Sequence, residues 1–246
     1  MIRVHDFQKA YRDVVAVQGL SFELLPGQVL GLVGPNGAGK TSTLRSLAGV
    51  IPPTGGTLEI AGCDVVADPI EAKRRVAYIP DDPKLFDALT VWEHLEFIAG
   101  AYGLSDWEAA SESLLEQFEL ASKRDALASE LSRGMRQKTA ICCAYLREPK
   151  VILFDEPHTG LDPKGIRSMK TSVLARAEAG ASVIVSSHLL EIVEDLCTHL
   201  LILHRGTSLF FGSMSDARHR FAGEGATLEE AFFRATEGEP SAEAVG

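Results

Sequence analysis

The sequence predicts an α/β fold with a mainly parallel sheet, an N-terminal antiparallel β subdomain and a helical insertion. In the second half, short and continuously apolar segments alternate with helical ones, as in a parallel sheet covered on both faces. Near the N-terminus, a glycine-rich loop joins an apolar strand to a helix. Between these regions, residues 83–147 have the periodicity of helices, which predicts the insertion.

Length and composition indicate one large domain, residues 1–236, followed by a tail at 237–246 that we expect to be disordered. The formal charge of −10 argues against nucleic acid as a partner, because phosphate backbones bind to basic faces. The four cysteines lack C-x-x-C spacing and fit free thiols in a reducing cytosol. No apolar run approaches the roughly 18 residues of a membrane helix, so we do not expect the chain to cross a membrane by itself.

The first 60 residues predict antiparallel strands. Residues 2–7, 20–25 and 57–60 alternate between apolar and polar and are bounded by glycine and proline turn signals. Tyr11 is expected in the polar connection between the first two strands, where a partly exposed turn aromatic is the simplest interpretation.

Residues 34–41, GPNGAGKT, fit the phosphate-loop pattern G-x-x-x-x-G-K-[ST] between a strand at 29–33 and a helix at 41–48. The glycines let successive N–H groups face one anion, and the helix adds the positive end of its dipole. Lys40 would reach the β- and γ-phosphates, and the Thr41 hydroxyl would bind magnesium. The alternative is an ordinary glycine-rich turn. The predicted nucleotide-binding residues here are Gly34, Pro35, Asn36, Gly37, Ala38, Gly39, Lys40, Thr41 and Ser42.

In the helical region, residues 89–95 open one helix, and the Ser105–Glu108 spacing predicts a capping box that opens another. A second polar loop at 131–138, LSRGMRQK, then enters a helix that Ser132 would cap. The N–H groups near Gly134 would again face an anion, although a simple N-cap is the alternative. One nucleotide does not need two such loops, so the second is predicted to serve a partner's nucleotide.

The apolar strand at 151–154 ends in two adjacent carboxylates, Asp155 and Glu156. We expect Asp155 to hold magnesium through water and Glu156 to polarise the attacking water, with a solvated turn as the alternative. Further along, the pattern predicts a helix at 163–179, a strand at 181–186, a helix at 189–196 and a strand at 200–204. His188 follows one of these strand ends and could sense a γ-phosphate.

Taken in order, these segments resemble the ATP-binding subunits of ABC transporters over residues 2 to 234, which implies a phosphate-loop ATPase core. Residues 131–137 resemble the family's signature motif, 151–156 its Walker B strand with the catalytic glutamate, and 159–162 its D-loop with Asp162. The resemblance implies that His188 is the switch histidine and that Tyr11 stacks on adenine. It also implies that the signature residues Ser132, Arg133, Gly134 and Met135 act on the partner's nucleotide.

Two positions depart from the family pattern. The signature is usually L-S-G-G-Q, and Arg133 and Met135 replace its third and fifth residues. Asp81 stands where the family normally has a glutamine after the proline of the Q-loop. A carboxylate keeps an oxygen ligand and loses the amide donor, so Asp81 is predicted to join Thr41 and Asp155 at the metal, with a solvated loop acid as the alternative.

The resemblance implies a chain that binds and hydrolyses ATP with Mg²⁺ and drives transport through a separate permease. Two copies, as a homodimer, would pair head to tail and trap two ATP, and the complex would lie on the cytoplasmic face of the cell membrane. The altered signature, the acidic Q-loop and the expected lack of a C-terminal regulatory domain favour export. An importer subunit and a soluble non-transport ABC ATPase are the alternatives, although the latter needs coiled-coil heptads that are not seen.

Overall fold

The structure, a computed structural model, describes residues 1–221 and contains two sheets. The smaller sheet is antiparallel with the order β2-β1-β4-β5. Its strands are β1 (Ile2–Tyr11), β2 (Val14–Leu24), β4 (Gly55–Ile60) and β5 (Cys63–Asp64). This sheet is the predicted N-terminal β subdomain.

The larger sheet has the order β10-β9-β3-β8-β7-β6 and is parallel except for β10 at one edge. Its strands are β3 (Val29–Val33), β6 (Val76–Ile79), β7 (Val151–Asp155), β8 (Ser182–Ser186), β9 (His199–His204) and β10 (Thr207–Ser213). Because parallel strands point the same way, the loops that follow β3, β6, β7 and β8 leave one edge of the sheet.

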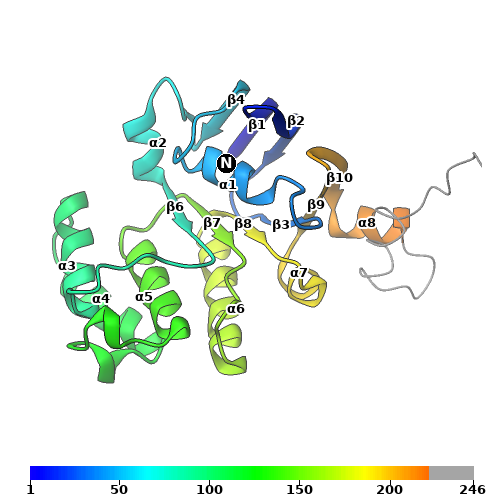
Figure 1. Ribbon diagram of the computed structural model, residues 1–246. Coiled ribbons are helices and arrows are strands. Elements are labelled where there is room, and N and C mark those ends of the chain that lie inside the picture. The colour runs from blue at the N-terminus through cyan, green and yellow to red at the C-terminus, as the bar shows by residue number, and fades with distance from the viewer. Residues whose placement is uncertain (222–246) are drawn as a thin grey trace, which may run out of the picture.

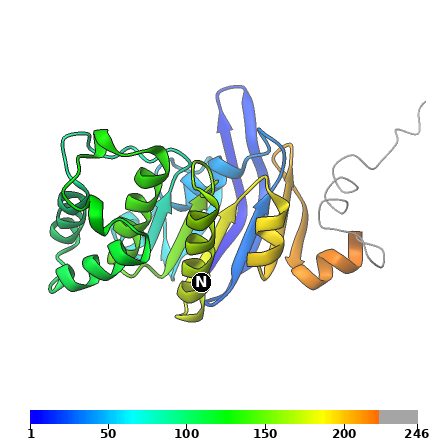
Figure 2. The same ribbon diagram turned by 90° about the horizontal axis from the view of Figure 1, so that it is seen from below.

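Helices cover both faces of the larger sheet, and α3, α4 and α5 gather on one side of it while α8 lies on the opposite side (Figures 1 and 2). The helices are α1 (Lys40–Leu47), α2 (Pro69–Arg75), α3 (Val91–Tyr102), α4 (Trp107–Gln117), α5 (Arg133–Leu146), α6 (Pro163–Glu178), α7 (Leu190–Leu196) and α8 (Met214–Phe221). Within residues 1–221, no helix has the length and apolar character to cross a bilayer. The architecture confirms the predicted fold class, while the domain limits stay a prediction and the expected tail at 237–246 lies outside the described residues.

Alternate residues of β3 enter two different hydrophobic cores, which explains its continuous apolar sequence. Leu30 and Leu32 pack in the core that contains α1 and the antiparallel sheet. Val29 and Val33 pack in the core that contains α6 and α7. Helix α1 therefore lies between the two sheets (Figure 1). Burial of each large apolar side chain of β3 and α1 contributes about 1.5–3 kcal/mol, and it fixes both ends of the loop that joins these two elements.

The start of α4 differs from the prediction. Ser105 and Glu108 do not form a capping box, because Asp106 is the N-cap residue, has φ +52° and makes no side-chain cap bond. The capping box belongs to α3, where the Glu93 N–H donates to Thr90 Oγ1 at 3.1 Å and the Thr90 N–H donates to a Glu93 carboxylate oxygen at 2.7 Å. The S-x-x-E spacing alone does not ensure the extended cap backbone that a capping box requires.

The position of Tyr11 also differs from the prediction. It is the last residue of β1 and pairs with Val14, so it lies in the hairpin and not in a polar connection. The hairpin is longer than predicted because its outer residues are exposed and give no alternating pattern.

Candidate active site

The glycine-rich loop between β3 and α1 passes so close to neighbouring backbone that two of its glycines are required. A Cβ at Gly39 would lie 2.6 Å from the Ala16 carbonyl oxygen, and a Cβ at Gly34 would lie 2.3 Å from that of Leu203. Gly39 also has φ +106°, which side-chain-bearing residues rarely adopt. The strands on either side therefore hold the loop in one shape.

A cavity of about 390 Å³ opens beside this loop and the first turn of α1. The predicted nucleotide-binding residues from Asn36 to Ser42 all line it, together with Glu156. Lys40 donates from Nζ to the carbonyl oxygen of Gly34 at 2.6 Å, and burial lowers the pKa of its ammonium group while the nearby carboxylates oppose that shift. The structure thus gathers backbone N–H groups and one cation around a single space, which suits an anion.

Asp155, the last residue of β7, is buried and accepts hydrogen bonds on both carboxylate oxygens. Oδ1 accepts from Ser186 Oγ at 2.7 Å and from Thr41 Oγ1 at 3.2 Å. Oδ2 accepts from the Tyr78 hydroxyl at 3.1 Å, and burial raises the pKa of Tyr78 to about 12, so the phenol keeps its proton. Two oxygen ligands from Thr41 and Asp155 side by side fit a hard cation such as Mg²⁺.

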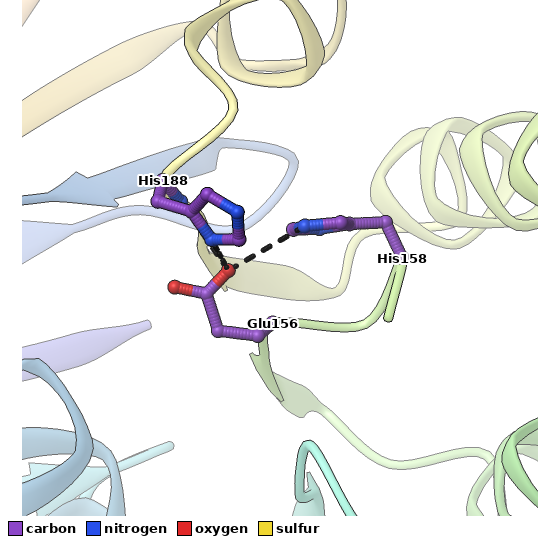
Figure 3. A group of neighbouring side chains, drawn as sticks. All are labelled: Glu156, His158 and His188. Carbon is purple, nitrogen blue, oxygen red and sulfur yellow. Dashed lines mark hydrogen bonds and ion pairs between the residues drawn. The ribbon is translucent and has the colours of Figure 1, made fainter. Parts of the chain in front are cut away.

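Glu156 turns the chain sharply after β7. Its φ is +51°, a conformation that costs a residue with a side chain about 1–3 kcal/mol. Its backbone N–H donates to the Ser186 carbonyl oxygen at 3.1 Å, and one carboxylate oxygen, Oε2, accepts from His188 Nδ1 at 2.7 Å (Figure 3). Since β7 and β8 are neighbouring parallel strands, the residues that follow them meet, and the carboxylate is held at the cavity wall.

A second cavity of about 570 Å³ adjoins the same loop and contains the unusual Q-loop and signature residues. Its walls include Asn36, Asp81, Arg133, Glu156 and His188. The Arg133 guanidinium donates from Nη2 to the Asp81 carboxylate at 2.9 Å, and both side chains are about half exposed. The two departures from the family pattern are therefore in direct contact, and a role of Asp81 at the metal stays a prediction.

The signature segment begins α5 and packs on the D-loop of the same chain. Ser132 is the predicted N-cap, and its Oγ accepts from the Met135 N–H at 3.3 Å. A Cβ at Gly134 would lie 2.5 Å from the Gly160 carbonyl oxygen, which explains the glycine. Asp162 caps α6 by accepting from the Gly165 N–H at 2.8 Å.

Tyr11 lies beside the start of α1. Its hydroxyl is 3.3 Å from Ser42 Oγ, and the Lys9 ammonium is 4.7 Å from the centre of its ring. The ring is partly exposed. Its stacking on adenine stays a prediction.

Sequence reasoning missed three side chains of the site, Tyr78, Ser186 and His158. Tyr78 and Ser186 hold Asp155 from the strands on either side of β7. For Ser186, the sequence signal was its position at the carboxyl end of the predicted strand at 181–186, where side chains from distant segments meet. His158 contacts Glu156, two residues earlier, and no motif pointed to it.

The glycine-rich loop, the Thr41–Asp155 pair and the glutamate that follows define the site of a phosphate-loop ATPase. A family model described as "ABC transporter" matches residues 17–159. The chain is 36% identical to the ABC-type transporter ATP-binding protein EcsA of Bacillus subtilis, over 96% of each chain. It is 35% identical to the Nod factor export ATP-binding protein I of Cupriavidus metallidurans, over 86% of this chain and 71% of that protein.

Among solved structures, an ATP-binding subunit of an ABC transporter has a TM-score of 0.91 and 34% identity and covers 96% of this chain and 99% of its own. The chain belongs to the ABC transporter family of ATP-binding subunits. It binds ATP and is an ATPase.

Proposed function

We propose that this chain hydrolyses ATP with Mg²⁺ held at Thr41 and Asp155 and uses the energy to drive export through a separate membrane permease. The observation that carries the proposal is the Glu156 carboxylate. It lies one residue after the buried Asp155, borders both cavities and is oriented by His188. A carboxylate so placed can accept a proton from a water molecule that attacks a phosphate.

Each neighbouring group has a task that follows from its contacts. The N–H groups of residues 36–41 and Lys40 bind the phosphates, and Tyr78 and Ser186 keep Asp155 oriented. When bound, Mg²⁺ neutralises charge on the phosphate oxygens. Glu156 takes the proton of the attacking water, and His188 Nδ1 and the His188 backbone N–H hold its carboxylate in place.

The position of the signature segment supports a head-to-tail dimer. Among the described residues, the signature segment contributes Arg133 to the lining of the second cavity but not Ser132, which is exposed at the N-terminus of α5. A hydroxyl and free N–H groups at a helix start suit a phosphate that comes from outside the chain. Two identical chains would then each complete the other's site.

A groove of about 290 Å³ beside α3 supports contact with a permease. Phe86, Phe97 and Tyr102 line it and expose their rings, and an exposed aromatic cluster is typical of a protein interface. The relative named for Nod factor export favours export over import, and an importer subunit is the alternative. Because a permease lies in the membrane and ATP is a cytoplasmic substrate, we infer that the subunit lies at the cytoplasmic face of the cell membrane.

The test is the ATPase rate of Glu156→Gln, which keeps the size and polarity of the side chain and removes the base. We expect the rate to fall by about 100- to 10,000-fold, because general-base catalysis is lost, while ATP affinity is kept. Glu112→Gln on α4, an exposed glutamate that lines neither cavity, is the matched control. A Glu156→Gln variant with the wild-type rate would contradict the proposed base.

A further inference from the structure

His158 is buried beside the catalytic glutamate, and the mechanism above does not use it. Only 6% of its side chain is exposed, and among the described residues neither ring nitrogen has a hydrogen-bond partner. Buried polar groups are nearly always paired. His94, the other well-buried histidine, shows the usual pattern, because its Nε2 accepts from the Phe86 N–H at 3.0 Å and its Nδ1 bonds to the Thr90 carbonyl oxygen at 2.7 Å.

The His158 ring, whose nitrogens lack a hydrogen-bond partner among the described residues, faces Glu156 and His188 (Figure 3). His158 Nε2 lies 3.6 Å from Glu156 Oε2, and His188 Nδ1 lies 2.7 Å from the same oxygen. One ligand atom of each residue lies within 4.8 Å of the other two. In a tetrahedral zinc site with bonds of 2.0–2.2 Å, ligand atoms are about 3.4 Å apart, so adjustments of roughly 1 Å would bring the three atoms around one ion.

We propose that Glu156, His158 and His188 form a binding site for a borderline transition-metal cation, Zn²⁺ in the first instance, and that the bound ion removes Glu156 from catalysis. The ligand set of two imidazole nitrogens and one carboxylate oxygen is one that zinc prefers. Mg²⁺ prefers oxygen ligands alone. The site is therefore chemically distinct from the Thr41–Asp155 pair.

Two further features favour this site. Burial lowers the pKa of His158, which keeps the imidazole neutral and able to bind a metal. Glu156 and His188 also border the cavity of about 570 Å³, which leaves room for water as a fourth ligand. The four cysteines are buried, and burial raises the pKa of Cys142, Cys143 and Cys197, which disfavours the thiolate form of these three as a metal ligand.

Metal binding itself needs only the geometry, whereas inhibition rests on the proposed role of Glu156. An ion on Glu156 Oε2 and His188 Nδ1 would replace the hydrogen bond between them. The carboxylate would then be a metal ligand and no longer a proton acceptor. Zinc would thus slow hydrolysis without displacing Mg²⁺ from its own ligands.

The first experiment measures Zn²⁺ binding to the full chain without nucleotide, after EDTA treatment, by calorimetry. We expect one Zn²⁺ per chain at this site, and an affinity at least about tenfold weaker in His158→Ala and in His158→Gln. His5→Asn, which removes an exposed histidine of β1, should bind like the wild type. Equal affinities for the wild type and a folded His158 variant would overturn the proposal.

Cobalt provides a readout that needs no variant. Co²⁺ added to the wild-type chain should give the intense visible absorption of a tetrahedral site, and Zn²⁺ should remove it while millimolar Mg²⁺ does not. A six-coordinate cobalt spectrum, or displacement by Mg²⁺, would overturn the assignment.

The second experiment measures ATP hydrolysis at buffered free Zn²⁺ with excess Mg²⁺. The zinc concentration that halves the rate should rise at least about tenfold in the His158 variants and stay constant in His5→Asn. Zinc binding without inhibition would overturn the link to catalysis. Failure of the Glu156→Gln test would instead reject the proposed base and leave the binding result standing.

Discussion

Asp155 shows how single side chains prepare the site. Tyr78 and Ser186 donate to opposite carboxylate oxygens, so the group is buried without being left unpaired. Leaving such a buried group unpaired would cost about 1–3 kcal/mol, and more for a charged group. Contiguous motifs predicted Asp155 and Glu156, but their partners come from other strands, so the linear sequence could not show the pairs.

Tyr11 is predicted to stack on the adenine of ATP. If its ring stacks on adenine, Tyr11→Ala should weaken ATP binding by about 1–3 kcal/mol and Tyr11→Phe should barely change it, because stacking needs the ring and not the hydroxyl. Calorimetric titration with ATP measures both. Phe97→Ala, which removes an exposed ring of α3, is the control. Equal affinities for the wild type and Tyr11→Ala would leave Tyr11 as a hairpin aromatic with a contact to Ser42.

Strands and helices that are well buried were predicted from the sequence more accurately than exposed ones. β3, β7 and β8 are buried on both faces, and their continuous apolar sequences predicted them to within a residue or two. β10 and α2 were not predicted, because β10 is an edge strand with mostly exposed or half-buried residues and α2 has a single buried residue. Short elements that bury one side chain leave almost no periodic pattern.

The loop after β6 and the first residue of α5 meet through Asp81 and Arg133. An exposed ion pair of this kind contributes about 0–1 kcal/mol to stability, so it can open at little cost in free energy. While this pair is closed, the guanidinium occupies one carboxylate oxygen of Asp81 and leaves only the other for the predicted metal role.

The element-scale prediction separates these two roles of Asp81. If its carboxylate binds the metal, Asp81→Ala should lower the ATPase rate about tenfold or more and change its magnesium dependence, whereas Asp81→Asn and Asp81→Gln keep most of the rate. Arg133→Ala should then lower the magnesium concentration that gives half the maximal rate, because it frees the carboxylate oxygen that the guanidinium occupies. Rates measured across a magnesium series test this. If Asp81→Ala matches the wild type in rate and magnesium dependence, the carboxylate has no part in the site.

In the whole molecule, the residues predicted to bind the nucleotide and the signature serine, Ser132, lie in different parts of the chain. The phosphate loop and Glu156 line the two cavities at the carboxyl ends of the parallel strands, and Asp155 is buried beside Thr41. Ser132 is the N-cap of α5, which lies in the group of helices α3, α4 and α5. The motifs predicted that the signature loop serves a partner's nucleotide, because one nucleotide does not need two anion-binding loops, and this assignment stays a prediction. The relative placement of the two loops could not be predicted, because it depends on how α5 packs against the core.

The whole-molecule prediction is an ATP-bound dimer. Glu156→Gln should block hydrolysis and let the closed form accumulate, so size exclusion with light scattering in ATP and Mg²⁺ should give twice the mass of the 26.5 kDa chain. A double variant with Ser132→Asp and Glu156→Gln should not form the dimer. Aspartate still caps α5, but its negative charge would repel the phosphates of the nucleotide bound to the partner chain. Ser132→Thr, which keeps both the cap and the hydroxyl, is the matched control and should dimerise. A dimer that forms equally with Ser132→Asp would show that the signature serine does not face a phosphate. A Glu156→Gln chain that stays monomeric in saturating ATP and Mg²⁺ would contradict dimer formation by this chain alone.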